Sequence, residues 1–297
     1  MNTFQMAINN LNEGKERKRG RKKKLNVVLD SESVDIRLNG VDMLRTAINW
    51  GIVIGDNHGN TLFERDFIIS DIYNTPLRNV LNSYYIAKLQ PIENDPTTEF
   101  VANFKEFYDG LRQMWLSLSA FWDLEFWSFN ADFDCKAFLL NAEYFMNENF
   151  RDKEFEQWLL DNWFCIQNLA VNTILSTDDF KMFVLENMLM TDSANYPTNA
   201  EDTYRYIIKN PEFEEDHTGL SDSRIEYEIL LECKAIATSE TPRQRISGAW
   251  RTINPKTYKM GKKQYCVATK GQIFWEKAND CLPKGATETT FIQRIEL

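Results

Sequence analysis

A short apolar run that ends in two acids is the feature that most constrains this chain. The segment from Leu25 to Leu29 is nearly all apolar, which is typical of a central strand buried on both faces. Asp30 and Glu32 follow it directly. Because residues i and i+2 of a strand point to the same face, these two carboxylates project together, with Ser31 on the other side. The pattern predicts a sheet that carries paired acids at the end of a buried strand.

The rest of the sequence up to residue 238 alternates between strand and helix patterns. Strands are predicted near 49–54 and 61–69, and the turn-forming residues 56–60 between them predict a β-hairpin. The further predicted elements are a helix at 99–118, a strand at 124–129, a helix at 132–146, a short strand at 164–166, and helices at 199–208 and 220–237. Residues 71–97 are ambiguous. This order predicts an α/β fold of the ribonuclease H-like kind, a mixed sheet with an antiparallel hairpin flanked by helices.

Charge is distributed unevenly along the chain, whose formal net charge is −10. Residues 15–24 hold eight basic residues and one acid, so residues 1–24 are interpreted as a basic flexible arm. Such an arm suits phosphate binding through counterion release, and a disordered solubilising tail is the alternative. The residues predicted to contact nucleic acid are Arg17, Lys18, Arg19, Arg21, Lys22, Lys23 and Lys24.

The character of the sequence changes again after Thr238. Residues 242–297 carry eleven Lys or Arg against four acids, and aromatic residues alternate with the cations. Residues 239–297 are therefore interpreted as a basic, β-rich C-terminal appendage to a domain spanning 25–238. Its aromatic residues either stack on bases beside phosphate contacts or form the core of the appendage.

Composition excludes several classes of protein. No apolar stretch approaches the ~20 residues of a membrane-spanning helix, so no membrane partner is expected. Five scattered Cys without a C-x-x-C pair indicate neither a disulfide framework nor a zinc site. A reduced, cytoplasmic setting fits best.

Three more polar residues occur at positions where a polar side chain indicates a possible function. Asp134 opens a predicted helix just after an apolar-aromatic run. Asp222 shares a helical stripe with Ile225 and Ile229, which should face the sheet, and an uncompensated carboxylate there is costly. His217 precedes it by five residues, and histidine suits proton removal near neutral pH. The alternatives are an acid favoured by the helix dipole at Asp222 and an ordinary exposed loop histidine at His217.

Together these motifs resemble those of the DEDDh, or DnaQ-like, 3′→5′ exonucleases. Leu29-Asp30-Ser31-Glu32 resembles the family's first motif, Asn130-Ala131-Asp132-Phe133-Asp134 the second, and His217-Thr218-Gly219-Leu220-Ser221-Asp222 the third. The segment 199–206 is similar to the helix that precedes the third motif in phage and bacterial members. The resemblance covers residues 25–238. The first motif continues as Ser33-Val34-Asp35 in place of the Thr-Gly common in proofreading members.

The resemblance implies a two-metal mechanism with Mg²⁺ or Mn²⁺ as the two divalent cations. Asp30, Glu32 and Asp222 would hold one ion, and Asp30 with Asp134 would help to hold the second. His217 would accept a proton from the attacking water, and a nucleoside 5′-monophosphate would leave. Asn130 is expected to brace the loop that carries Asp134, and so to position substrate indirectly.

The sequence therefore predicts a metal-dependent 3′→5′ exonuclease acting on the 3′ ends of single-stranded nucleic acid, with DNA favoured. An exonuclease directed at RNA is one alternative, and a non-catalytic nucleic-acid-binding module on the same fold is another. A polymerase or replication partner is not identified by the sequence.

Overall fold

The computed structural model describes residues 3–12, 22–36, 44–73, 92, 95–239, 257–260, 263–267 and 273–275. The chain divides into two compact units, residues 1–233 and residues 234–297. Within the described residues, no helix combines the length and the apolar character that crossing a bilayer requires.

The first unit is built on a six-stranded mixed sheet with the strand order β4-β3-β2-β1-β5-β6. The strands are β1 (Lys23–Ile36), β2 (Leu44–Gly55), β3 (Thr61–Ile69), β4 (Thr98–Val101), β5 (Trp122–Ser128) and β6 (Trp163–Cys165). The central pairs β1–β2 and β2–β3 are antiparallel, and β4, β5 and β6 each pair in parallel. The predicted mixed α/β sheet, with its hairpin at residues 56–60, is confirmed.

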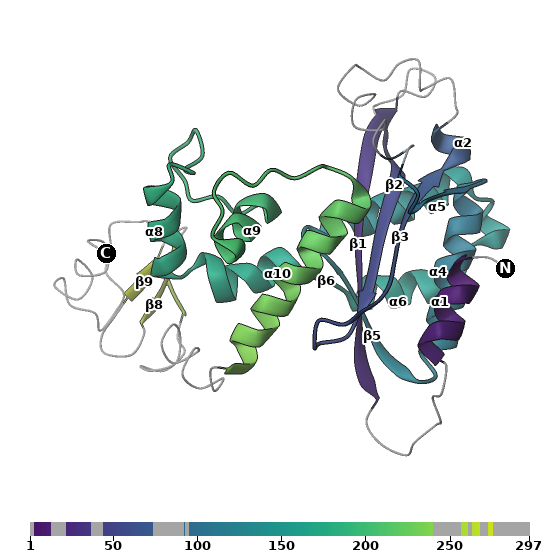
Figure 1. Ribbon diagram of the computed structural model, residues 1–297, viewed down its shortest axis with the longest axis horizontal. Helices are drawn as coiled ribbons and strands as arrows, with labels where there is room; N and C mark the ends of the chain where they lie inside the picture. The colour runs from purple at the N-terminus through teal and green to yellow at the C-terminus, as the bar shows by residue number, and fades with distance from the viewer. Residues whose placement is uncertain are drawn as a thin grey trace. The chain divides into compact units, whose positions relative to one another are not determined.

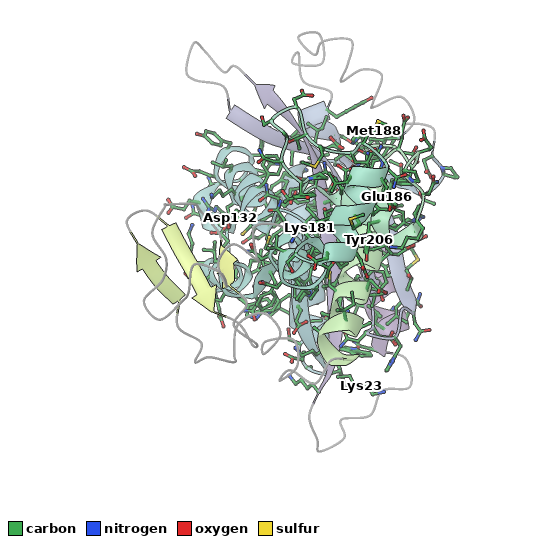
Figure 2. The ribbon with its side chains drawn as sticks, turned by 90° about the vertical axis from the view of Figure 1, so that its left-hand side faces the viewer. Lys23, Asp132, Lys181, Glu186, Met188 and Tyr206 are labelled. Carbon is green, nitrogen blue, oxygen red and sulfur yellow. The ribbon has the colours of Figure 1, made fainter. Side chains whose placement is uncertain are left out.

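Helices cover both faces of this sheet (Figure 1). The helical segments are α1 (Thr3–Asn12), α2 (Ser70–Tyr73), α4 (Phe104–Leu118), α5 (Ala131–Phe145), a 3₁₀ turn (Glu148–Phe150), α6 (Lys153–Asn162), α7 (Ile166–Ala170), a π-helical turn (Val171–Leu175), α8 (Asp178–Glu186), α9 (Ala200–Ile208) and α10 (Gly219–Ser239). Figure 1 shows α1, α4 and α6 on one side of the sheet and α10 on the other. Helices α8 and α9 meet where the rings of Phe180 and Phe183 pack edge-on against Tyr206, which is labelled in Figure 2.

Alternation along β1 decides what each face of the sheet contains. Leu25, Val27 and Leu29 point into the main hydrophobic core, beside α1, α4 and α5. The alternate residues of β1, among them Asp30 and Glu32, therefore face the side of α10. One strand thus supplies both the core and the candidate site.

Two elements differ from the prediction in where they begin or end. β1 extends to Ile36, past the expected end at residue 29, because it pairs with β2 along its length with one irregularity after Glu32. The predicted helix at 99–118 begins only at Phe104, because Thr98–Val101 pairs with β3 as β4. Asn103 marks the boundary, since its side chain accepts a hydrogen bond from the N–H of Glu106 and caps the helix.

The prediction of a flexible arm over residues 1–24 is wrong for residues 3–12. These form α1, an amphipathic helix whose Phe4, Ile8 and Leu11 are buried. The ring of Phe4 stacks on Phe67 of β3 with a centroid distance of 4.9 Å. Gly110 of α4 allows the approach, because a Cβ there would lie 2.2 Å from the Phe4 ring.

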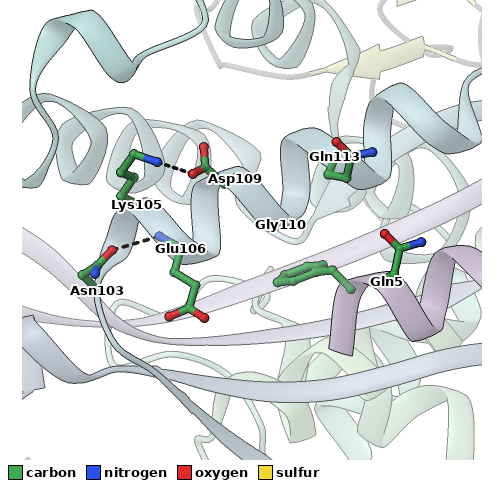
Figure 3. A pocket seen from close by; sticks show the side chains of 8 residues that line it. Gln5, Asn103, Lys105, Glu106, Asp109, Gly110 and Gln113 are labelled. Carbon is green, nitrogen blue, oxygen red and sulfur yellow. Dashed lines mark hydrogen bonds and ion pairs between the residues drawn. The ribbon is translucent and has the colours of Figure 1, made fainter. Parts of the chain in front are cut away.

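A groove of about 560 Å³ runs along the junction of α1 and α4 (Figure 3). Polar residues such as Gln5, Glu106 and Gln113 line it. It lies over α1 and α4, on the face of the sheet opposite Asp30 and Glu32, and it takes no part in the candidate site.

The basic residues of the predicted arm fall in two groups. Arg17, Lys18, Arg19 and Arg21 lie outside the described residues. Lys23 and Lys24 belong to β1, where Lys24 pairs with Glu125 of β5. Lys22, just before the strand, contacts the carbonyl oxygen of Ser119. An arm role for these three lysines is therefore not supported, because they are part of the folded unit.

In the second unit, three short strands form an antiparallel sheet, β7 (Thr257–Met260), β8 (Lys263–Val267) and β9 (Ile273–Trp275). Strand content in this region agrees with the predicted β-rich appendage. The side chains on which the stacking interpretation depends lie outside the described part of the chain.

The docking of α1 can be tested with Phe4→Ala. Truncating this buried ring should lower the free energy of unfolding by about 3–5 kcal/mol. Gln5→Ala, an exposed neighbour on the same helix, should change it by less than about 0.5 kcal/mol. Urea unfolding followed by circular dichroism measures both, and a wild-type midpoint for Phe4→Ala would mean that α1 is not docked.

Candidate metal centre

The N-terminus of α10 lies directly on the central strands. Gly51 of β2 pairs with Asp30 of β1, and a Cβ at Gly51 would lie only 1.9 Å from the carbonyl oxygen of Gly219. The reverse also holds, because a Cβ at Gly219 would lie 2.5 Å from the Gly51 nitrogen. Two glycines facing each other therefore allow backbone-to-backbone contact, which brings the third sequence motif against the first.

Two hydrogen bonds join α10 to the strands at this contact, and a third supports one of them from within the sheet. The N–H of Gly219 donates to Asn49 Oδ1 at 2.9 Å, and Asn49 in turn donates to Asp66 Oδ1 at 2.6 Å. The N–H of Asp30 donates to the buried hydroxyl of Ser223 at 3.0 Å. The first turn of α10 is thus bonded to both β1 and β2. Sequence reasoning missed Asn49 and Asp66, because their only signal in the sequence is a polar side chain next to apolar residues of a strand.

Three predicted site residues come together above this contact. One ligand atom from each of Glu32, His217 and Asp222 lies within 4.8 Å of the other two, the only such set among the described residues. His217 has a left-handed backbone (φ 54°), its side chain is 47% exposed, and its Nδ1 lies 3.8 Å from Glu215 Oε2. A non-glycine residue rarely adopts this conformation, which turns the chain into α10.

Asp134 reaches the site from the first turn of α5. It is buried, and its Oδ1 accepts a hydrogen bond from Ser31 Oγ at 2.7 Å. Burial raises the pKa of the Asp134 carboxyl to about 7, and the Ser31 bond opposes that rise. Asp134 is therefore tied to β1 through the residue between Asp30 and Glu32. Both Asp134 and Asp30, which were predicted as metal ligands, stand outside the set of three ligand atoms.

Asn130 occupies the N-cap position of α5, but its side chain is exposed and makes no capping hydrogen bond. Its carbonyl oxygen accepts from the N–H groups of Phe133, at 2.8 Å, and Asp134, at 3.3 Å. These are the ordinary first main-chain bonds of a helix, so the bracing role of Asn130 stays a prediction.

Asp30 is the carboxylate on which the other acids act most. Burial is the first cause that raises its pKa well above the usual value, followed by the charges of Glu226, Asp134, Asp222 and Glu32. All four charge effects come from acids, so they repel the ionised form. The centre is a dense negative site, and hard divalent cations such as Mg²⁺ or Mn²⁺ are the natural counter-charge for carboxylate oxygens.

Glu226, which sequence reasoning missed, is a further buried acid on α10. It lies one helical turn after Asp222 on α10 and is 3% exposed. Burial is the first cause that raises its pKa well above the usual value, and the charges of Asp134 and Asp222 follow. Its sequence signal is a Glu beside Ile225 within the apolar stripe of α10.

Comparison with known proteins gives only distant similarity. No family model matches the sequence, and no match is found among curated proteins. Among solved structures, the chain is similar to a 3′-exonuclease whose structure shows 3′-end-specific recognition of a histone mRNA stem-loop. The identity is 10% over 90% of this chain and 96% of that chain, and the TM-score is 0.45.

Two further solved structures show similarity of the same extent. One is the nuclease domain of 3′hExo, a DEDDh family member, bound to rAMP, at 14% identity over 74% of this chain and 94% of that chain, with a TM-score of 0.44. The other is S. pombe Pop2p in its Mg²⁺- and Mn²⁺-bound form, at 14% identity over 82% of this chain and 93% of that chain, with a TM-score of 0.46.

The contact between Gly51 and Gly219 predicts the effect of adding a methyl group. Gly51→Ala and Gly219→Ala should each lower the free energy of unfolding by about 1–3 kcal/mol, because backbone atoms cannot move aside without shifting α10. In the double variant the second methyl group should cost much less than it does alone, since α10 has already moved. Urea unfolding of the three variants measures this, and full additivity would contradict a shared contact.

The raised pKa of the buried Asp66 carboxyl predicts that the stability of the protein depends on pH. Burial raises its pKa to about 7 in the folded protein, so its contribution is fully present below about pH 4 and is lost as pH rises through 7. Relative to Asp66→Asn, the wild type should therefore lose stability between about pH 4 and pH 7, by about 1.4 kcal/mol for each unit of pKa difference. Asp123→Asn removes an exposed acid and should leave the profile unchanged. Equal slopes for wild type and Asp66→Asn would contradict this assignment.

Proposed function

We propose that this protein is a metal-dependent 3′→5′ exonuclease that hydrolyses terminal phosphodiesters of single-stranded nucleic acid. The observation that carries the proposal is the convergence of Glu32, His217 and Asp222 within 4.8 Å of one another. These residues come from the first and third sequence motifs, which are 185 positions apart between Glu32 and His217. Asp134, from the second motif, is bonded to the strand that carries the first.

The proposed cofactors are two divalent cations, Mg²⁺ or Mn²⁺. In the proposal, Asp30, Glu32, Asp134 and Asp222 hold them, because carboxylate oxygens are the ligands that these cations prefer. The repulsion among the acids, which raises the pKa of Asp30, is relieved when cations bind. Bound cations of this kind supply a nucleophile at neutral pH and stabilise charge on the leaving oxygen.

His217 is proposed as the general base. Its exposed imidazole stands at the entrance of α10, beside Glu32 and Asp222, where substrate and water can reach it. Glu215 Oε2 lies 3.8 Å from Nδ1 of this ring, so a carboxyl group is placed to orient the imidazole and to stabilise it once it is protonated. DNA is the favoured polymer on sequence grounds, and RNA is the alternative.

The proposal predicts which substitutions abolish cleavage. His217→Ala and Asp222→Asn should lower the rate by about 10²–10⁴-fold or more, because a proton acceptor or a metal ligand is lost, while the fold is kept. The assay is Mg²⁺-dependent digestion of 5′-labelled single-stranded DNA and RNA, run side by side with an EDTA control. A ladder that shortens from the 3′ end is expected.

Matched controls come from neighbouring positions. His58→Ala removes the other histidine, in the β2–β3 turn. Asp134→Asn and Asp132→Asn remove the same charge from the first turn of α5, but Asp134 is buried at the site and the side chain of Asp132 is 91% exposed (Figure 2). Only Asp134→Asn should impair cleavage. Wild-type rates for His217→Ala or Asp222→Asn, or cleavage that persists in EDTA, would contradict the proposal.

A further inference from the structure

The loop between α9 and α10 carries the proposed base, His217. This residue has a left-handed backbone, and its side chain is half-exposed. A half-exposed ring has few packing neighbours, so its position depends on how the main chain is held on either side of it. On the downstream side, the N–H of Gly219 donates to Asn49 Oδ1 at 2.9 Å, which fixes the chain two residues after His217.

On the upstream side, the loop is held by Arg205 of α9. All three nitrogens of its guanidinium donate hydrogen bonds. The Nε–H donates to the carbonyl oxygen of Phe213 at 2.7 Å, in the loop itself. The two terminal nitrogens donate to carboxylates of α9, Nη1 to Asp202 Oδ1 at 2.8 Å and Nη2 to Glu201 Oε1 at 3.0 Å. Arg205 therefore ties the loop to the helix four residues before the proposed base.

The same network reaches the residue beside the imidazole. Glu201 Oε1, which Arg205 binds, also accepts a hydrogen bond from the N–H of Glu215 at 3.3 Å. The Oε2 atom of Glu215 lies 3.8 Å from Nδ1 of His217. A displacement of Glu215 would therefore move both the chain that leads into His217 and the carboxyl group beside its ring.

The surroundings of Arg205 suit a fixed geometry. Its side chain is only 16% exposed, and a planar guanidinium that bonds through all its nitrogens has one orientation. Asp202 is fixed in turn, because its N–H and its Oδ2 atom are both bonded to the side chain of Asn199, which caps α9. Helix α9 is also bonded to α10, where the hydroxyl of Tyr204 donates to Glu228 Oε2 at 2.8 Å. Loss of Arg205 should therefore loosen the loop and leave α9 in place.

We propose that Arg205 is a positioning residue for His217, which holds the loop against α9 so that the imidazole stays beside Glu32 and Asp222. This inference rests on the proposed function, in which His217 is the general base. It extends the site to a residue that none of the three sequence motifs includes. The bonds of Arg205 go to the loop and to its own helix, so its effect on the ring passes through the main chain.

The test follows the ring of His217 itself. The chain has two histidines, so a ¹H–¹³C correlation spectrum of the full-length protein labelled in histidine contains one Cε1–H signal from His217 and one from His58. His58 lies in the β2–β3 turn and serves as the internal reference. Arg205→Met keeps an unbranched side chain without a donor. It should move the His217 signal toward its position in the urea-unfolded protein and leave the His58 signal in place.

The kinetics of Arg205→Met give a second measurement. It should lower kcat on single-stranded nucleic acid by about 10–10²-fold and leave KM unchanged, because a displaced base slows the chemical step and not substrate binding. Arg205→Lys keeps the charge but not the rigid fork, so its kcat should lie between those of the wild type and Arg205→Met. A loss of stability alone would reduce the amount of folded protein without moving its His217 signal.

Arg112→Met is the matched control, because it removes an arginine of α4 that is ion-paired with Asp152, on the face of the sheet opposite α10 (Figure 1). It should leave the His217 signal and kcat unchanged. If Arg205→Met does not fold, Glu201→Ala decides the question. It removes the acceptor for the Glu215 N–H and should move the His217 signal in the same direction.

Two results would overturn the inference. One is a wild-type His217 signal in the folded variant, and the other is a moved signal with unchanged kcat. Both leave the proposed function standing if the wild type cleaves nucleic acid in Mg²⁺ and His217→Ala does not. If the wild type cleaves no nucleic acid, the proposed function fails, and a moved His217 signal in Arg205→Met would still show that Arg205 sets the position of this ring.

Discussion

The contact between the backbones of Gly51 and Gly219 is the constraint on which the rest of this centre depends. It sets the N-terminus of α10 against the strand pair that carries Asp30 and Glu32. The hydrogen bond from Gly219 to Asn49 then fixes the helix in register. A side chain at either glycine would hold α10 away from the sheet, and the ligand atoms of Asp222 and His217 would no longer meet that of Glu32.

Because this contact brings acid-bearing elements together, the fold also has an electrostatic cost. Asp30, Asp134 and Glu226 all have raised pKa values, and burial is the first cause in each case. A centre that keeps so many acids inside folded protein is stabilised by whatever brings positive charge to it. In the proposed function, divalent cations act as structural counter-charges as well as reagents, so their binding would link stability to activity.

The sequence predicted the parts whose signal is local. The apolar run before Asp30, the hairpin at residues 56–60 and the start of α10 depend on neighbouring residues, and the structure has them within a few positions. It missed features that depend on distant partners. Nothing near Gly51 shows that Gly219 will pack on it, α1 is stabilised by Phe67 far along the chain, and β4 exists only because β3 pairs with it. Glu226 was missed because a single Glu on an amphipathic helix normally faces solvent.

Anomalous diffraction from a crystal of the protein grown with Mn²⁺ tests the central claim most directly, because it locates the cation without relying on activity. We expect an anomalous peak at the N-terminus of α10, from a cation coordinated by carboxylate oxygens of Asp30, Glu32 and Asp222. A crystal that holds Mn²⁺ elsewhere, with no peak between β1 and α10, would contradict it.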